Sequence, residues 1–297
     1  MPQKRSFGFV ADSPDHFDRE AETTLFLIRE IERLGHSVFL CEPKDLFLKQ
    51  NEVWAKGINL KSLDCLFLRK DPPFDLAYLH HLYLLVKLEG EVLMINEPSA
   101  ILEFNEKLST LDFPFSPKTL VSANMRQICD WARSQKNGVV LKPLHLSGGT
   151  NIHWIKRSAV SNQRSAKILK QMTANGLEPI ICQEYLMAAK KGDKRILVWD
   201  GKILGGFLRK PKPGEFRANL HQGGRFVACE LTARDKKIAH KVGKWAKAKG
   251  LYFVGLDVIG EHLTEINVTS PMGIREVNVL YGECVEKEII HSILKRI

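Results

Sequence analysis

Three oxygen-bearing side chains interrupt an otherwise apolar stretch near the end of the sequence. The stretch, residues 253–271, carries Asp257, Glu265 and Asn267 among valines, leucines and isoleucines. A buried carboxylate is unfavourable unless a partner compensates its charge. Glu265 and Asn267 share one face of a strand, and a tight turn at 260–262 brings that strand beside Asp257. Such hard oxygen ligands suit Mg²⁺; the alternative is that the acids pair with lysines or arginines.

A lysine in the middle of a predicted strand is the second candidate for chemistry. Lys142 precedes a loop that contains Gly148 and Gly149. An ammonium group followed by free backbone N–H groups can hold the phosphates of a nucleotide. The segment lacks the GxxxxGK[ST] pattern of a P-loop, and two adjacent glycines often form only a turn. The segment alone therefore leaves both interpretations open.

Arginines in the carboxyl-terminal third form the third candidate group. Arg195, Arg209 and Arg217 can each hold a carboxylate or a phosphate through two parallel hydrogen bonds. Residues 207–224 are rich in glycine, proline and asparagine, which suits a mobile loop that closes over a site. The alternative is that these arginines are exposed on a flexible loop.

The first part of the chain, residues 1–105, alternates expected strands with expected helices. This alternation predicts an α/β domain with a mostly parallel sheet. Gly35 follows one helical pattern and is typical of a helix C-terminus. The expected strands cover 6–11, 37–41, the start of 63–75, and 92–96, and the expected helices cover 20–34 and 76–89.

The remainder divides into two α+β parts, residues 106–187 and 188–297. In the first of these, Asn124 is a suitable N-cap for a helix. The second opens with two apolar runs joined by Asp200-Gly201, which is a strong hairpin signal. A lysine-rich helix at 236–250, the strand pair described above and a C-terminal helix follow.

The composition is that of a globular protein outside membranes. Of the 297 residues, 44% are hydrophobic and 26% charged, and no apolar run approaches the roughly 18 residues of a membrane span. The N-terminus lacks an apolar stretch of signal-peptide length, so we expect a cytoplasmic protein without a membrane partner. Six cysteines without a CxxC pair predict buried, reduced thiols, and the histidines form no zinc motif.

The net charge of +10 raises the question of an anionic partner. Much of the excess lies in the helix at 236–250, where Ile238, Val242 and Trp245 recur at helical spacing. This pattern favours a surface helix that packs one apolar stripe and exposes its lysines to water. Because no nucleic-acid motif accompanies it, we do not expect a nucleic-acid partner.

The order and spacing of several motifs resemble bacterial, prokaryotic-type glutathione synthetases of the ATP-grasp superfamily along nearly the whole chain. The matching segments are RKDPPFD, NEKL, LKPL with its later glycine pair, QEYL before GDKR, RANL with its later glycine pair, and GLDVIG before LTEINVTSP. The resemblance implies an ATP-grasp architecture. An N-terminal parallel α/β domain, called pre-ATP-grasp, precedes two α+β subdomains that clamp the nucleotide.

The resemblance also implies a role for each matching residue. Asp257, Glu265 and Asn267 match ligands of Mg²⁺, for which Mn²⁺ is a substitute, and Arg195 and Arg209 match arginines near the reacting carboxylate. The residues that match the ATP site are Lys107, Lys142, Gly148, Gly149, Gln183, Glu184, Tyr185, Leu186 and Asp193. The residues that match the peptide-substrate site and the closing loop are Asp12, Arg217, Asn219, Thr269 and Ser270.

This chain departs from the family pattern on loops. Where the family has Pro-Leu-Asp-Gly-Met-Gly-Gly, this chain has His145 in place of the Asp and Leu146 in place of the first Gly. Where the family has NVTSPT, this chain has Met272 in place of the last Thr. Where the family has RGNLAAGG, this chain has Ala218 in place of the first Gly. These changes spare the expected metal ligands and phosphate lysines. We therefore expect intact use of ATP and Mg²⁺, a phosphate loop that moves less or closes differently, and substrates that the family pattern alone does not fix.

The expected reaction joins γ-glutamylcysteine to glycine through an acyl phosphate and yields glutathione, ADP and phosphate. The alternative is a related ATP-grasp carboxylate–amine ligase with a different amine acceptor or peptide donor, which Met272 motivates. A non-catalytic nucleotide-binding protein is a third reading. We expect small-molecule substrates as partners and a homo-oligomer, either a dimer or a tetramer.

Overall fold

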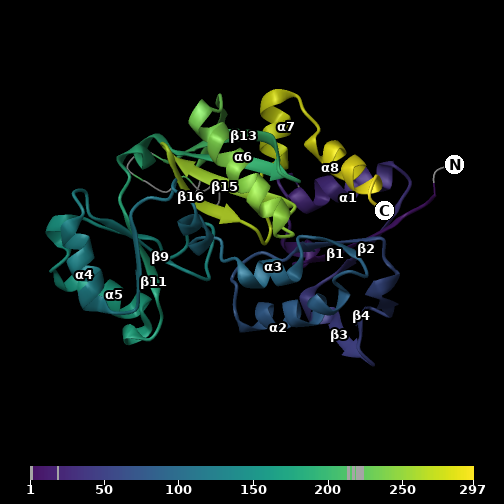
Figure 1. Cartoon of the computed structure of the whole chain (residues 1–297), viewed down its shortest axis with the longest axis horizontal. Coiled ribbons are helices and arrows are strands. Elements are labelled where there is room, and N and C mark those ends of the chain that lie inside the picture. The colour runs from purple at the N-terminus through teal and green to yellow at the C-terminus, as the bar shows by residue number, and fades with distance from the viewer. Residues whose placement is uncertain (1–2, 19, 213–214, 216–217, 219–223) are drawn as a thin grey trace.

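The computed structural model describes residues 3–18, 20–212, 215, 218 and 224–297. The N-terminal part contains a parallel sheet in the order β2-β1-β6-β7, as the alternating pattern predicted. Its strands are β1 (Ser6–Ala11), β2 (Ser37–Cys41), β6 (Cys65–Arg69) and β7 (Leu93–Ile95), and its helices are α1 (Thr23–Arg33), α2 (Leu76–Leu85) and α3 (Pro98–Glu103). Figure 1 shows this part at the lower right.

Helix α1 is shorter than the expected 20–34. Its N-cap is Glu22, whose side chain accepts a hydrogen bond from Thr24 N at 2.9 Å. Gly35 adopts a φ of 84° just beyond the last turn, the left-handed conformation that glycine accepts most readily. A small antiparallel sheet between β2 and β6 was not predicted; it comprises β3 (Leu46–Lys49), β4 (Glu52–Ala55) and β5 (Ile58–Asn59).

The central part is an antiparallel sheet in the order β10-β9-β11-β8, which packs against α4 (Met125–Ser134) and α5 (Gln163–Met172). Its strands are β8 (Thr119–Ser122), β9 (Val139–Pro143), β10 (His153–Ile155) and β11 (Ile180–Glu184). In β9, Val139 and Leu141 are buried in the core under the helices, whereas Lys142 lies on the opposite face. The period of two along the strand thus turns the lysine away from this core. Asn124 caps α4, as predicted.

The C-terminal part is an antiparallel sheet in the order β14-β13-β12-β15-β16. Its strands are β12 (Asp193–Trp199), β13 (Lys202–Lys210), β14 (Arg225–Ala228), β15 (Phe253–Ile259) and β16 (His262–Asn267). The predicted hairpin at Asp200-Gly201 is confirmed, with φ angles of 48° and 82° that match the twist of the strands. Helix α6 (Ala233–Ala248) is the predicted lysine-rich helix, and Ile238 and Val242 on its apolar stripe are buried.

The expected single C-terminal helix is wrong. The chain forms α7 (Ile274–Tyr281) and α8 (Val285–Leu294), separated at Gly282, which has a φ of 70°. The prediction that the cysteines are buried is wrong for Cys284, which is exposed at this break. It is confirmed for Cys41, Cys65 and Cys182. No helix in the described part of the chain has the length and apolar character that a membrane crossing needs.

The three larger sheets fall within the predicted ranges, but the cores do not separate along the sequence. One cluster joins Phe7 and Leu27 of the N-terminal part to Trp199 and Ile289 of the C-terminal part, and α1 packs against α8 (Figure 1). The first and last thirds therefore form one packed body. The boundaries at 105/106 and 187/188 stay a prediction.

Asn96 connects β7 to the C-terminal sheet from a buried position. Its Nδ2 donates to Phe253 O and Val268 O, both at 2.8 Å, and its Oδ1 accepts from Phe253 N at 2.7 Å. Because the amide satisfies backbone groups of two further segments, its loss leaves buried polar atoms without partners.

We expect Asn96→Ala to lower the free energy of unfolding by about 3 kcal/mol, since each unsatisfied buried group costs about 1–3 kcal/mol. Urea unfolding followed by tryptophan fluorescence measures the change. Gln163→Ala removes an exposed amide from α5 and is the matched control, for which we expect almost no change. Equal stability of the two variants would contradict the role of Asn96.

Candidate active site

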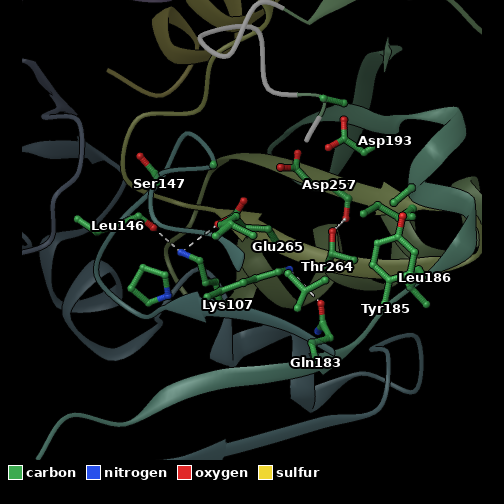
Figure 2. A pocket seen from close by; sticks show the side chains of 18 of the residues that line it. Lys107, Leu146, Ser147, Gln183, Tyr185, Leu186, Asp193, Asp257, Thr264 and Glu265 are labelled. Atoms are coloured by element: carbon green, nitrogen blue, oxygen red, sulfur yellow. Dashed lines mark hydrogen bonds and ion pairs between the residues drawn. The ribbon is translucent and has the colours of Figure 1, made fainter. Parts of the chain in front are cut away.

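Two cavities meet between the central and C-terminal sheets, and Ser147 and Glu265 line both of them. The first cavity lies between β9 and β11 on one side and β15 and β16 on the other, as Figure 2 shows. The second is bounded by β13, the segment after β16 and the beginning of α7. A group bound in one cavity can therefore meet a group bound in the other.

One end of the first cavity is apolar. It is lined by Val140, Ile152, Tyr185, Leu186 and Ile259. The ring of Tyr185 stacks on Trp154 with centroids 4.1 Å apart, and Tyr185 N donates to Gly138 O at 3.0 Å. A flat slot with one aromatic wall suits the base of a nucleotide.

The expected hinge, Gln183–Leu186, lines this cavity in full. The side chain of Glu184 accepts from Lys118 N at 2.9 Å, and Oε1 of Gln183 accepts from Lys142 Nζ. The two side chains therefore have different roles: Glu184 connects the hinge to the start of β8, and Gln183 binds the ammonium group of Lys142.

The other end of the first cavity carries the lysines expected to bind phosphate. Lys107 Nζ lies 3.2 Å from Glu265 Oε1 and donates to Leu146 O at 2.5 Å. Lys142 Nζ donates to Gln183 Oε1 at 2.9 Å. Burial lowers the pKa of Lys142, although the carboxylate of Glu265 opposes this effect. Both ammonium groups thus have partners that a polyphosphate can replace.

The loop after β9 is fixed to neighbouring segments by its carbonyl groups. Phe74 N donates to His145 O at 2.9 Å, and Asn105 Nδ2 donates to Leu144 O at 3.0 Å. The left-handed φ angles of this loop fall on Gly148, Gly149 and Asn151, at 65°, 76° and 53°, and not on Leu146. A leucine is therefore compatible with this loop conformation. A different mode of loop closure stays a prediction.

A buried network of two arginines and two aspartates lies beside the lysines. Arg195 Nε donates to Asp257 Oδ1 at 2.6 Å, and Arg209 Nη2 lies 2.8 Å from Asp257 Oδ2. Arg209 Nε donates to Asp193 Oδ1 at 2.6 Å. The strand register explains the network, because Asp193 pairs with Arg209 and Arg195 pairs with Asp257 across β12, β13 and β15.

Opposing effects set the ionisation of this network. Burial by itself would raise the pKa of Asp257, but the guanidinium groups of Arg195 and Arg209 outweigh it and lower that pKa. Burial likewise opposes the charge of Arg209, and the carboxylates of Asp193 and Asp257 raise its pKa above the ordinary value. The pKa of Asp193 is raised, because burial outweighs Arg209 there.

The three predicted metal ligands come together on one face of the β15–β16 hairpin. Asp257 is directly opposite Glu265, and Gly255 is opposite Asn267. The alternative interpretation is confirmed, since Asp257 pairs with arginines and Glu265 pairs with Lys107, and metal binding by these acids stays a prediction. In the described residues no three His, Cys, Asp or Glu side chains form a metal-binding group, and the predicted site therefore depends on the amide oxygen of Asn267 as its third donor. Two carboxylates and an amide oxygen fit a hard divalent cation in chemistry.

The second cavity contains the expected Thr269 and Ser270 together with Met272. Asp12, by contrast, does not line this cavity. Its carboxylate accepts a hydrogen bond from Asp71 N at 2.7 Å and pairs with Lys70 Nζ at 3.2 Å. Asp12 therefore supports the wall residue Asp71 and does not face the cavity itself. Arg217 and Asn219 of the expected closing loop lie outside the described residues.

Several further charged residues line the second cavity and were not predicted from the sequence, namely Asp18, Asp71, Glu106, Arg275 and Glu276. Glu106 is buried, and its Oε1 accepts from Thr269 Oγ1 at 2.9 Å and from Val268 N at 3.0 Å. Glu106 and Asp71 both stand inside motifs that the resemblance used, NEKL and RKDPPFD. Their position inside these motifs was the signal in the sequence that could have identified them as residues of the site.

The fold is the ATP-grasp fold, as the comparison with solved structures shows. The structure of D-cycloserine synthetase DcsG superimposes with a TM-score of 0.75 at 13% identity and covers 98% of this chain and 99% of that one. The ATP-grasp ligase PsnB complexed with its minimal precursor gives a TM-score of 0.68 at 14% identity, with 97% and 99% covered. At such identities the likeness concerns the fold alone.

The sequence comparisons define the family more narrowly. Residues 106–282 match the family model of the prokaryotic glutathione synthetase ATP-grasp domain, and residues 6–62 and 55–101 match that of the N-terminal domain. Glutathione synthetases of Pseudomonas syringae and Coxiella burnetii are each 37% identical, over 98% and 95% of this chain and 97% and 94% of theirs. The chain belongs to the prokaryotic glutathione synthetase family. It is a carbon–nitrogen ligase that uses ATP and a divalent metal ion.

Proposed function

We propose that this chain joins the cysteinyl carboxylate of γ-glutamylcysteine to the amino group of glycine and converts ATP to ADP and phosphate. The observation that carries the proposal is the junction of the two cavities at Glu265 and Ser147, with Arg195 and Arg209 lining the second cavity there. The junction is where a phosphoryl group from one ligand can reach a carboxylate of the other.

The first cavity takes the nucleotide. The stacked wall at Tyr185 holds the base, and Lys107 and Lys142 bind the phosphates, as the resemblance implied. Asp257, Glu265 and Asn267 are the proposed ligands of Mg²⁺, with Mn²⁺ as a substitute. When bound, the cation neutralises charge on the transferring phosphoryl group.

A carboxylate is a poor acyl donor, because oxide is its leaving group. Phosphorylation by ATP turns the oxygen into part of a phosphate, which leaves when the acceptor amine attacks. Arg195 and Arg209 face the second cavity and can stabilise the acyl phosphate and the oxyanion that follows. Asp257 holds both guanidinium groups in place before substrate arrives.

The second cavity takes the dipeptide and the amine acceptor. A γ-glutamyl group carries both an ammonium and a carboxylate, and the lining offers Asp71 and Arg275 as opposite charges for them. Asp71 is exposed, but desolvation of its carboxylate raises its pKa, so an incoming ammonium group stabilises its charged form. Thr269 and Ser270 supply hydroxyl groups, and Asp12 supports Asp71. We propose that Arg217 and Asn219 belong to the closing loop.

The alternative acceptor has one specific observation in its favour. Met272 stands where the family motif has a threonine, lines the second cavity and places its Sδ 3.5 Å from Nη2 of the buried Arg69. A thioether is a weaker acceptor than a hydroxyl, and its methyl group narrows the space for the amine. A ligase with a different acceptor or peptide donor is therefore the second candidate.

Phosphate release by the purified protein tests the two candidates. With ATP, Mg²⁺ and γ-glutamylcysteine, we expect release to require glycine and to produce glutathione, identified by mass spectrometry. A panel of other small amines and of dipeptides without the γ-linkage completes the assay. Release with another amine, and none with glycine, would replace the first candidate by the second, whereas no release with any pair would refute both.

We further propose that the reaction takes place in the cytoplasm, where the reducing environment keeps the substrate thiol free. The described residues agree with such an environment, since all six cysteines are unpaired. A homodimer or homotetramer is our proposal for the assembly, and sedimentation velocity measures it.

A further inference from the structure

A run of hydrogen bonds crosses the central sheet and ends on the ammonium group of Lys142. Lys142 Nζ donates to Gln183 Oε1 at 2.9 Å, and Gln183 Nε2 donates to Thr119 Oγ1 at 3.0 Å. The hydroxyl of Thr119 in turn donates to Pro117 O at 2.9 Å. The strands that carry these residues, β9, β11 and β8, are neighbours in the sheet, and Gln183 stands directly opposite Thr119.

The chemistry of the groups fixes the direction of every bond in this run. The carbonyl oxygen of Pro117 can only accept, so the hydroxyl proton of Thr119 points to it. The hydroxyl oxygen then accepts from the amide NH₂ of Gln183, which leaves the amide oxygen for Lys142. Because Gln183 is 4% exposed, water is largely excluded as a substitute partner.

We propose that Thr119 is a positioning residue for the phosphate-binding lysine. Its hydroxyl holds the amide of Gln183 in the one orientation that presents oxygen to Lys142, and the amide aims the ammonium group into the nucleotide cavity. A lysine has three N–H donors, so those not used by Gln183 are available for phosphate. The inference rests on the proposed function only in that a nucleotide occupies this cavity.

The electrostatic surroundings make the orientation of the amide important. Burial opposes the charge of Lys142; Glu265, Asp257 and Asp193 favour that charge, and Lys107 opposes it. Without the hydroxyl of Thr119, the buried NH₂ of Gln183 has no acceptor, and the amide is held at one end only. The side chain of Gln183 can then shift, and the ammonium group of Lys142 is no longer fixed in the position that awaits the phosphates.

The substitution Thr119→Val tests the role of the hydroxyl alone. Valine keeps the branched shape that suits β8 and removes only the polar atom. We expect the affinity for a non-hydrolysable ATP analogue with Mg²⁺, measured by calorimetry, to fall about tenfold, because the hydroxyl acts on the ammonium group only through the amide of Gln183. Thr119→Ser keeps the hydroxyl and should bind like the wild type.

A control on the same strand separates positioning from loss of structure. Ser122→Ala removes a hydroxyl that donates to Gln127 on the helix side of β8, at 2.8 Å, and should leave nucleotide affinity unchanged. Thermal unfolding of each variant shows whether the subdomain is intact. We expect Thr119→Val and Ser122→Ala to unfold within a few degrees of the wild type.

A double-mutant cycle with Lys142→Met gives the decisive readout. If Thr119 acts through Lys142, Thr119→Val has no further effect on affinity once the lysine is gone. Additive losses, or an affinity of Thr119→Val equal to that of the wild type, would overturn the positioning role and leave the proposed function intact. A wild-type protein that binds no nucleotide would overturn both.

Discussion

Replacing Asp257 by asparagine is expected to lower the free energy of unfolding by about 3–5 kcal/mol, the usual cost of breaking a buried ion pair. The carboxylate is 3% exposed and lies between Arg195 Nε at 2.6 Å and Arg209 Nη2 at 2.8 Å. An amide has the same shape but cannot neutralise two buried cations. We also expect a loss of phosphate release of about a hundredfold or more, because both arginines lose their fixed position.

Guanidinium chloride unfolding at several pH values measures this effect. The folded-state pKa of Asp257 is lowered, so its stabilisation is present above the ordinary pKa of about 4 and is lost as the pH falls through the folded-state value. The difference between wild type and variant should therefore be largest above about pH 5 and shrink in acid.

Asp130→Asn is the matched control for this experiment. Asp130 also pairs with an arginine, Arg133, at 2.8 Å, but both side chains are more than half exposed. An exposed pair contributes about 0–1 kcal/mol, so the control should differ little from the wild type. If Asp257→Asn were as stable as Asp130→Asn, the buried network would not hold the site together.

Replacing Lys107 by methionine is expected to lower kcat/KM for ATP by about a hundred- to a thousandfold, as for the loss of one preorganised charge-stabilising donor. Lys107 is buried, contacts Glu265 and Leu146 O, and lines the nucleotide cavity. Without it, the carboxylates of Glu265 and Glu106 repel each other, and both oppose the phosphates of ATP.

Steady-state kinetics at fixed metal concentration measure the loss, and calorimetry with ADP shows how much of it is binding. Lys237→Met, on the exposed face of α6, removes one positive charge far from the cavity lining and should leave kcat/KM within a factor of about two. A similar loss in both variants would assign the effect to net charge and contradict a specific role of Lys107.

Local patterns determined most secondary structure and the side on which key residues lie. The strands at 6–11 and 37–41, the hairpin at Asp200-Gly201 and the Asn124 cap all follow from neighbouring residues. Alternation along β9 placed Lys142 opposite the core, and the β15–β16 hairpin brought Asp257 to Glu265. Here the information is local, since periodicity and turn chemistry act over a few residues.

The order of the motifs along the sequence indicated the family. The expected ATP-site residues all line the first cavity except Gly148, which lines the second. Their individual roles stay proposals. The small sheet β3–β4–β5 and the break at Gly282 escaped prediction, because short strands and a lone glycine within a helical pattern carry little periodic signal.

The tertiary structure alone decided which distant charges meet. Nothing near Asp257 in the sequence indicates that Arg195 and Arg209 neutralise it, since that contact depends on the register of three strands. The same holds for Lys107 with Glu265, for Asn96 with Phe253, and for Thr119 behind Lys142. The sequence by itself determined the lysines, arginines and expected metal ligands of the site and the strand faces that carry them, but not the further charged residues of the second cavity. Their partners and their ionisation were decided by how the strands cross, because charge interactions and burial depend on distance in space and not on separation along the chain.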